Sequence, residues 1–207
     1  MSDIKNIEQH YSLDERPFLE KVRGFCQLVD ERYSPYLTDF LNPREIQIVE
    51  ELAHYYNLKF FVSSTLESEE YGRVILAPEY YELDDEDFEI KRLEISYARQ
   101  FNKLTHPKVL GALINQLGLD RQVFGDIILD EEGRVQFYIA SHLASYAIMT
   151  ITKIGNVSVT LKEVSKDDWI SNQENYSQSF VLLSSMRLDN VLATVLNLSR
   201  SNALKLI

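Results

Sequence analysis

The chain has 207 residues, 45% hydrophobic and 26% charged, a composition typical of a globular protein with room for two or three small domains. Asp3 and Glu8 lie near the N-terminus without a following apolar run, so we expect no secretory signal. No stretch approaches the ~18 consecutive apolar residues that would span a membrane. Cys26 is the single cysteine, which excludes an internal disulfide framework and favours a reducing, cytoplasmic setting.

The net charge of −11 argues on its face against nucleic acid as a partner, because phosphate neutralisation supplies most of the affinity of such proteins. The charge is unevenly distributed, however. Residues 1–80 hold eight basic and fifteen acidic side chains, whereas residues 186–207 hold three basic and one acidic. Residues 90–110 hold five basic side chains against Glu94 alone. An acidic chain with two basic zones is compatible with RNA that docks in one orientation.

Residues 1–82 are predicted to form a small N-terminal domain that contains both helices and strands. Apolar residues recur at helical spacing after Pro17, and again after Asn42-Pro43, a helix cap followed by a first-turn proline. Residues 59–64 and 73–77 have the apolar, β-branched and aromatic character of strands. The sequence therefore predicts two helices followed by a pair of strands.

Residues 83–165 show the clearest pattern of predicted elements in the chain. Their order is β-α-β-β-α-β, which is that of the ferredoxin-like or RRM-like plait. With the N-terminal domain, this order predicts the α+β fold class. Many proteins use the plait to hold RNA and many do not, so the fold alone decides no function. The predicted strands are residues 88–97, 124–129, 134–140 and 157–161, and the predicted helices are residues 105–117 and 141–150.

Residues 166–180 are polar and are predicted to be a linker or long loop, pinned by Trp169 and Tyr176. In residues 181–207, apolar side chains from Leu188 onward recur at helical spacing, and Ser199 is a good cap for a second helix. The sequence therefore predicts two short helices at the end of the chain.

The start of this second helix is a candidate phosphate site. Helix starts expose unpaired backbone N–H groups, and a guanidinium adds a two-pronged donor. From periodicity alone, an amphipathic helical hairpin with incidental arginines is the favoured explanation of the pattern. The candidate RNA-binding residues are Arg187, Ser199, Arg200, Ser201, Asn202 and Lys205.

The same segment resembles the first half of the alpha-L RNA-binding motif, the module named after the fourth small-subunit ribosomal protein (the S-four domain). In that family a Gly-x-Val-x-Val-Asn stretch follows the two helices and forms small strands. Because the sequence stops at Ile207, the resemblance implies a truncated module. The matching residues are Arg187-Leu188-Asp189, Val191-Leu192-Ala193, Leu198-Ser199-Arg200-Ser201, Ala203 and Leu206-Ile207.

Most of the remaining chain resembles the YlmH family of bacterial proteins, which carry the alpha-L motif at their C-terminus. One departure is Pro107-Lys108, where an Arg-Asp pair is expected after the histidine. This departure puts in doubt any polar role of that loop. The matching segments are Leu37-Thr38-Asp39-Phe40-Leu41-x-Pro43, Leu76-Ala77-Pro78-x-Tyr80, Phe101-x-x-Leu104-x-His106, Leu110-Gly111-Ala112-Leu113, Leu117-Gly118-Leu119-x-Arg121 and Gly125-Asp126-Ile127.

The resemblance implies a cytoplasmic, non-catalytic factor that binds structured RNA, either ribosomal RNA or tRNA, and uses no cofactor. Relatives with the module bind the large ribosomal subunit carrying a stalled peptidyl-tRNA, which implies a role in ribosome-associated quality control. Members of the family are also often labelled as cell-division proteins. The acidic N-terminal domain would then serve as a docking face for a protein partner, and no membrane partner is expected.

A second RNA surface is predicted on the basic stretch from Lys91 to Lys108, which is interleaved with the aromatic residues Tyr97 and Phe101. Aromatic rings can stack on unpaired bases while basic side chains follow the phosphates. An edge strand with ordinary solvated charges explains the same residues. The basic residues of this surface are Lys91, Arg92, Arg99, Lys103 and Lys108.

Two other classes of protein stay open as alternatives. An RNA-modifying enzyme could use the alpha-L motif for targeting, as pseudouridine synthases and tyrosyl-tRNA synthetases do, but residues 1–165 contain neither catalytic domain. A protein–protein adaptor linked to cell division would use the acidic N-terminal domain. The four histidines share no ligand spacing, so no metal site and no catalytic residue is predicted.

Overall fold

The computed structural model describes residues 11–63, 70–170 and 180–207. The chain divides into two compact units, Met1–Asn172 and Gln173–Ile207. In the described residues, the first unit contains two sheets with their helices, and the second contains two short helices. The predicted boundary between residues 82 and 83 lies inside the first unit and stays a prediction. Among the described helices, none has both the length and the apolar character needed to cross a bilayer.

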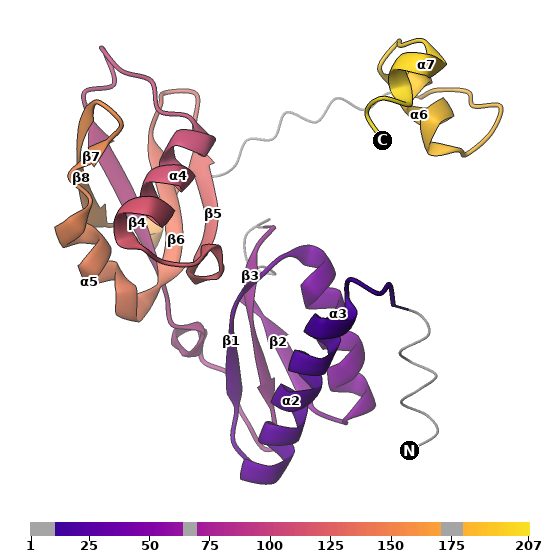
Figure 1. Ribbon diagram of the computed structural model, residues 1–207. Helices are drawn as coiled ribbons and strands as arrows, with labels where there is room; N and C mark the ends of the chain where they lie inside the picture. The colour runs from indigo at the N-terminus through magenta and orange to yellow at the C-terminus, as the bar shows by residue number, and fades with distance from the viewer. Residues whose placement is uncertain (1–10, 64–69, 171–179) are drawn as a thin grey trace. The chain divides into compact units, whose positions relative to one another are not determined.

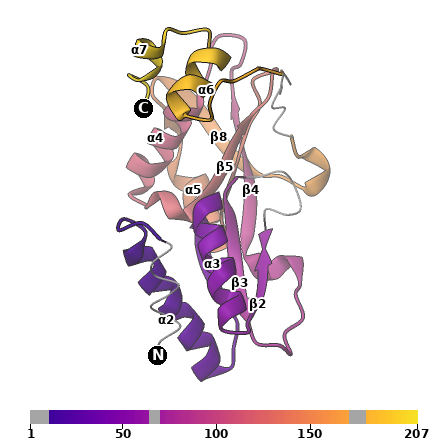
Figure 2. The ribbon, with the colours of Figure 1, turned by 90° about the vertical axis from the view of Figure 1, so that its right-hand side faces the viewer.

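The N-terminal part of the first unit is a three-stranded antiparallel sheet with two helices on one face. The sheet order is β1-β3-β2, and Figure 2 shows α2 and α3 running along the sheet. The two predicted helices and two predicted strands are present, and the sequence analysis missed β1. The elements are α2 (Arg16–Arg32), β1 (Tyr36–Leu41), α3 (Pro43–Tyr55), β2 (Lys59–Val62) and β3 (Gly72–Ala77).

Local chemistry explains where α3 begins. The Asn42 side chain accepts a hydrogen bond from the Glu45 N–H at 2.9 Å, and the Glu45 carboxylate accepts one from the Asn42 N–H at 2.9 Å. This reciprocal capping box satisfies two N–H groups that the first turn leaves unpaired. The apolar faces of α2 and α3 then bury Val22, Cys26 and Val49 against the sheet. Cys26 is thus a core residue, and burial raises the pKa of its thiol to about 11.

The remainder of the first unit is the predicted plait. Its sheet order is β5-β6-β4-β8-β7, in which β5, β6, β4 and β8 have the ferredoxin-like arrangement and β7 adds a short edge strand. All neighbouring strands are antiparallel. The α+β fold class is confirmed. The elements are β4 (Ile90–Tyr97), α4 (His106–Leu117), β5 (Phe124–Leu129), β6 (Val135–Ala140), α5 (Ser141–Thr150), β7 (Lys153–Ile154) and β8 (Val157–Glu163), with short 3-10 helices η2 (Asp85–Phe88), η3 (Arg121–Val123) and η4 (Lys166–Asp168).

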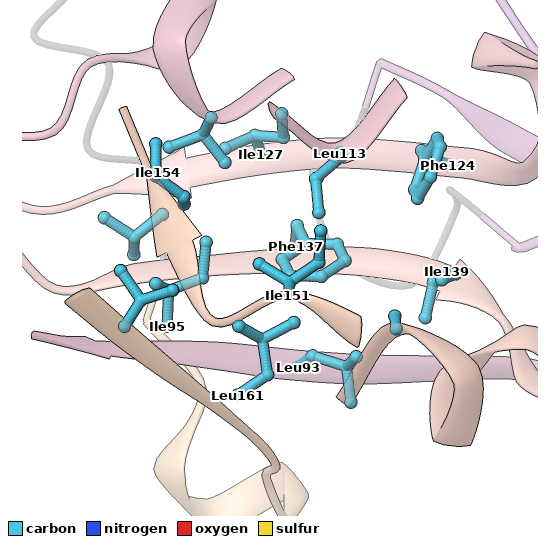
Figure 3. Close-up of a cluster of buried hydrophobic side chains, with 14 of the residues drawn as sticks. Leu93, Ile95, Leu113, Phe124, Ile127, Phe137, Ile139, Ile151, Ile154 and Leu161 are labelled. Carbon is cyan, nitrogen blue, oxygen red and sulfur yellow. The ribbon is translucent and has the colours of Figure 1, made fainter. Parts of the chain in front are cut away.

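Helices α4 and α5 cover one face of this five-stranded sheet (Figure 1). Between them and the sheet lies a core in which Phe137, Leu93 and Leu113 are fully buried (Figure 3). Burying such side chains contributes roughly 1.5–3 kcal/mol each. Because side chains alternate along a strand, the neighbours of Leu93 and Phe137 point to the opposite face. We call that opposite face the outer face.

Polar contacts tie the N-terminal sheet to the segment that leads into β4, and the two sheets of the first unit also approach each other closely. Buried Arg73 of β3 donates hydrogen bonds to the carbonyls of Thr38 (2.7 Å), Phe88 (3.0 Å) and Glu89 (3.1 Å). At Gly125 of β5, a Cβ atom would lie 2.8 Å from a ring carbon of Phe40, so only glycine fits without a shift. The Gly125-Asp126-Ile127 segment therefore marks the contact between the sheets.

The second unit contains α6 (Leu188–Val195) and α7 (Arg200–Ala203), which pack against each other. Asn197, between the helices, has a positive φ of 53°, a conformation that asparagine tolerates better than most residues. Ser199 caps α7 as predicted, since its side chain accepts a hydrogen bond from the Asn202 N–H at 3.3 Å. The α7 helix is one turn long.

Candidate nucleic-acid interface

Arg92 of β4 points to the outer face and is only 3% exposed. Its guanidinium carbon lies 4.8 Å from the centre of the Tyr138 ring and 4.9 Å from that of Trp169. It donates to the Tyr138 hydroxyl at 2.8 Å and to the carbonyl of Ile170. The prediction that Arg92 belongs to a second RNA surface is therefore wrong, because aromatic rings and the covering chain enclose its charge.

The chain from Lys166 to Ile170, which we call the covering segment, closes the outer face over β6. Gln136 is fully buried, and its amide donates to the carbonyl of Asp168 at 3.0 Å and accepts from the N–H of Ile170 at 3.1 Å. Ile170 packs with Tyr138 and with Phe40 of the N-terminal sheet. Trp169 thus pins this segment as predicted, while Tyr176 lies outside the described residues.

This closure bears on how the plait could bind RNA. Single-strand RNA-binding plaits stack bases on aromatic side chains of the sheet. Here the aromatic residue at the centre of the outer face, Tyr138, is 3% exposed and is occupied by Arg92 and Trp169. Tyr138 is consequently not available to stack on a base.

The other residues of the predicted second surface remain at the protein surface. Lys91 is exposed but pairs with Glu163, with 2.6 Å between Nζ and a carboxylate oxygen. Arg99, Lys103 and Lys108 are exposed in the stretch from the end of β4 to the first turn of α4. Phe101, in the same stretch, is 84% exposed. Its predicted companion Tyr97 is half-buried and donates its hydroxyl to the carbonyl of Gly133 at 2.7 Å.

In the second unit, the structure brings two of the predicted RNA-binding arginines together on one carboxylate. Asp189, in the first turn of α6, is only 4% exposed. Its Oδ1 lies 3.1 Å from Nε of Arg187, and its Oδ2 lies 2.5 Å from Nε of Arg200. Hydrogen bonds from Arg200 and then Arg187 lower the pKa of Asp189, so the carboxylate is charged at neutral pH.

This geometry decides which part of each guanidinium is available. Both arginines use their inner Nε atom on Asp189, while 69% of the Arg187 side chain and 59% of the Arg200 side chain stay exposed. The terminal amino groups that form a fork for a phosphate are therefore free to face outward. In the sequence, Asp189 was noted only as part of the matching stretch Arg187-Leu188-Asp189, and this role was not predicted. The signal was an acidic residue on the apolar stripe between two arginines.

The rest of the predicted phosphate site is less open than expected. The Asn202 N–H is directed at Ser199 Oγ, which also lies 3.1 Å from Ser201 Oγ. A single-turn helix also contributes little dipole. Ser199, Ser201, Asn202 and Lys205 are all exposed, so their side chains border the arginine pair without forming a closed anion cradle.

Comparison with known proteins places the chain in a family. It is 32% identical over 204 residues, 99% of the chain, to the Bacillus subtilis (strain 168) "Ribosome-associated protein quality control protein P2", and the match covers 79% of that protein. Residues 84–168 match the family model described as "Putative RNA-binding domain in YlmH". The chain belongs to the YlmH family.

A solved structure of the YlmH family has the same fold. The "Cell division protein ylmH from Streptococcus pneumoniae" is 40% identical and superposes with a TM-score of 0.70, covering 78% of this chain and 98% of that one. The span of the family model, residues 84–168, coincides closely with the plait and the beginning of the covering segment. The resemblance read from sequence motifs is therefore confirmed at the level of family and fold.

Proposed function

We propose that this YlmH-family chain is a non-catalytic RNA-binding protein that associates with the ribosome. The observation that carries the proposal is the arginine pair of the second unit, in which the buried carboxylate of Asp189 holds Arg187 and Arg200 by their Nε atoms. Guanidinium groups fixed in this way bind phosphate with less loss of side-chain entropy than freely rotating ones. Their outward forks suit the backbone of folded RNA.

Within that function, we propose ribosomal RNA or tRNA on the large ribosomal subunit as the target, in the rescue of stalled translation. The support is the Bacillus subtilis relative, whose name describes a ribosome-associated quality control protein. A factor of this kind would act in the cytoplasm, where ribosomes are. The Streptococcus pneumoniae relative is named as a cell division protein, and this name adds no chemical argument to the proposal.

Arg99, Lys103 and Lys108 form a second proposed RNA contact, on the plait. They are exposed near Phe101, and residues 84–168 match a family model whose description names RNA binding. The acidic residues 1–80 would repel phosphate and are proposed to face a basic protein partner instead. An adaptor of that kind would lose its protein partner, and keep its RNA, when the N-terminal surface is mutated.

The test is co-sedimentation with purified ribosomal subunits over a salt series. Arg187→Ala with Arg200→Ala is expected to abolish pelleting with the large subunit at a salt concentration where the unmodified protein still pellets, because two phosphate contacts are lost. A matched control is Arg16→Ala with Arg32→Ala, which removes the same charge from exposed positions of α2. Equal loss in both variants would contradict the proposal, because net charge rather than the arginine pair would then control binding.

A further inference from the structure

A cleft of about 540 Å³ opens on the plait where α4 meets the turn between β7 and β8. Gln116 of α4 donates to the carbonyl of Lys153 in β7 at 2.8 Å and so ties the two walls together. The volume lies within the range of pockets that hold single small ligands, roughly 300–1,000 Å³. This volume suits one unstacked nucleotide.

The lining combines apolar residues with polar and charged ones. Gly111, Ala112 and Ile154 contribute apolar surface, which we call the apolar floor, while Lys103 and Lys108 bring two positive charges. The amides of Asn115 and Asn156 add groups that can both donate and accept hydrogen bonds. None of the described residues that line the cleft is acidic, although the chain carries a net charge of −11. The cleft is therefore complementary to an anion that carries a planar, hydrogen-bonding group.

Gly111 keeps the cleft open. It lies inside α4, where glycine is less favourable than other residues because it loses more conformational freedom on folding. A Cβ atom at this position would meet nothing within 4 Å, so packing does not demand the glycine. Its lack of a side chain leaves space at the floor of the cleft, where a larger residue would project.

We propose that this cleft binds one unpaired nucleotide of single-stranded RNA, an inference that rests on the proposed RNA-binding function. Lys103 and Lys108 would contact its phosphate, the apolar floor would receive the base, and Asn115 and Asn156 would meet the base edge. RNA is favoured over an acidic protein segment for two reasons. Tyr138, at the centre of the outer face, is covered and cannot stack on a base, and the family model that names RNA binding spans every residue of the cleft.

The experiment uses the whole chain and a fluorescein-labelled single-stranded RNA of mixed sequence, about ten nucleotides long. Gly111→Leu fills the cleft while improving the helix propensity of α4, so the variant is expected to fold. It should weaken binding of the single strand about tenfold or more, since stacking of one base is worth that much. Gly24→Leu is the matched control, because Gly24 also lies inside a helix and its Cβ would meet nothing within 4 Å.

Photo-crosslinking with 4-thiouridine in the same RNA should label peptides that contain residues 103–116 or 153–157. Unchanged single-strand affinity in Gly111→Leu, or crosslinks confined to other peptides, would overturn the cleft assignment. If pelleting that depends on Arg187 and Arg200 persists in that case, the proposed function stands without the cleft. Polyglutamate that binds the unmodified protein but not Gly111→Leu, with RNA unaffected, would assign the cleft to an acidic protein segment and also overturn the proposal.

Discussion

Two arginine sites of this molecule meet their surroundings in opposite ways. In the plait, Arg92 is 3% exposed between Tyr138 and Trp169, and its terminal amino groups are used on the Tyr138 hydroxyl and the Ile170 carbonyl. In the second unit, Arg187 and Arg200 contact Asp189 through their inner Nε atoms, and their side chains stay 69% and 59% exposed. The same type of side chain is thus buried in the core of one surface and exposed for binding on another.

The comparison shows that the partner of a guanidinium indicates its role better than the local density of positive charge does. A carbonyl and two aromatic rings hold the fork end of Arg92 inside the protein, so it can stabilise the fold but cannot reach a phosphate. A buried carboxylate that takes only Nε leaves the fork end outside.

The largest effect is expected from Arg92→Met, which keeps most of the volume but removes the charge. The variant leaves the Tyr138 hydroxyl and the Ile170 carbonyl without their donor and loses two cation–π contacts, so the free energy of unfolding should fall by about 3 kcal/mol. Urea denaturation followed by the fluorescence of Trp169, the sole tryptophan of the chain, measures this loss. A variant as stable as the original would contradict a structural role for Arg92.

Gly125→Ala should disturb the packing at the outer face through Phe40 and Tyr138. Its Cβ would lie 2.8 Å from a ring carbon of Phe40 and 2.9 Å from Cβ of Tyr138, closer than packed atoms approach. We expect the free energy of unfolding to fall by about 1–3 kcal/mol. Gly24→Ala in α2 is the control and should be neutral or slightly stabilising, since it meets no neighbour. Equal effects at both positions would contradict the tight contact.

Asp189→Asn tests whether RNA binding needs Asp189 to position Arg187 and Arg200, or only the positive charge of the two arginines. Removal of a negative charge should by itself strengthen attraction to RNA. Loss of the ion pairs that hold Arg187 and Arg200 should weaken binding. We expect the second effect to win and RNA affinity to fall about fivefold, because the charge-assisted bonds that orient both forks are lost. The salt dependence should stay unchanged, since both arginines remain. Increased affinity would show that Asp189 does not position them.

The smallest effect concerns pH and the contact between the sheets of the first unit. Burial raises the pKa of Asp126, whose Oδ2 accepts hydrogen bonds from the N–H groups of Glu70 (2.8 Å) and Tyr71 (3.2 Å). The stability that Asp126 contributes is therefore fully present below its unfolded pKa and is lost as pH rises through the folded pKa.

Asp126→Asn keeps an oxygen for both N–H groups but cannot ionise. Its stability relative to the original protein should therefore improve as the pH rises from about 4 to 7. Urea denaturation of both proteins at several pH values gives this difference. A difference that stays flat across the range would mean that the carboxylate is not perturbed by burial.

Strict periodicity made much of the fold predictable from the sequence. The plait follows from alternating strands and amphipathic helices that agree over the whole segment. Strand β1 was missed because its apolar residues come in adjacent pairs, Tyr36-Leu37 and Phe40-Leu41, and the pairing register shifts between Leu37 and Phe40. A period of two cannot be recognised across such an irregularity.

The roles of the basic residues were harder to predict, since they depend on contacts that are distant in sequence. Arg92 and Arg99 look alike in the sequence, and the groups that enclose Arg92 come from positions 138, 169 and 170. Arg187 and Arg200 are exposed, but their common partner Asp189 could not be predicted, because it depends on the packing of α6 against α7.

The measurement that tests the central claim most directly is the salt dependence of RNA affinity for three proteins. These are the original chain, Arg187→Ala with Arg200→Ala, and Arg92→Met under conditions where it is folded. We expect the slope of log affinity against log salt to become shallower by about 1.5 in the double variant, as two phosphate contacts are lost, and to be unchanged in Arg92→Met. A slope that changes in Arg92→Met and not in the double variant would contradict the assignment of RNA binding to the arginine pair.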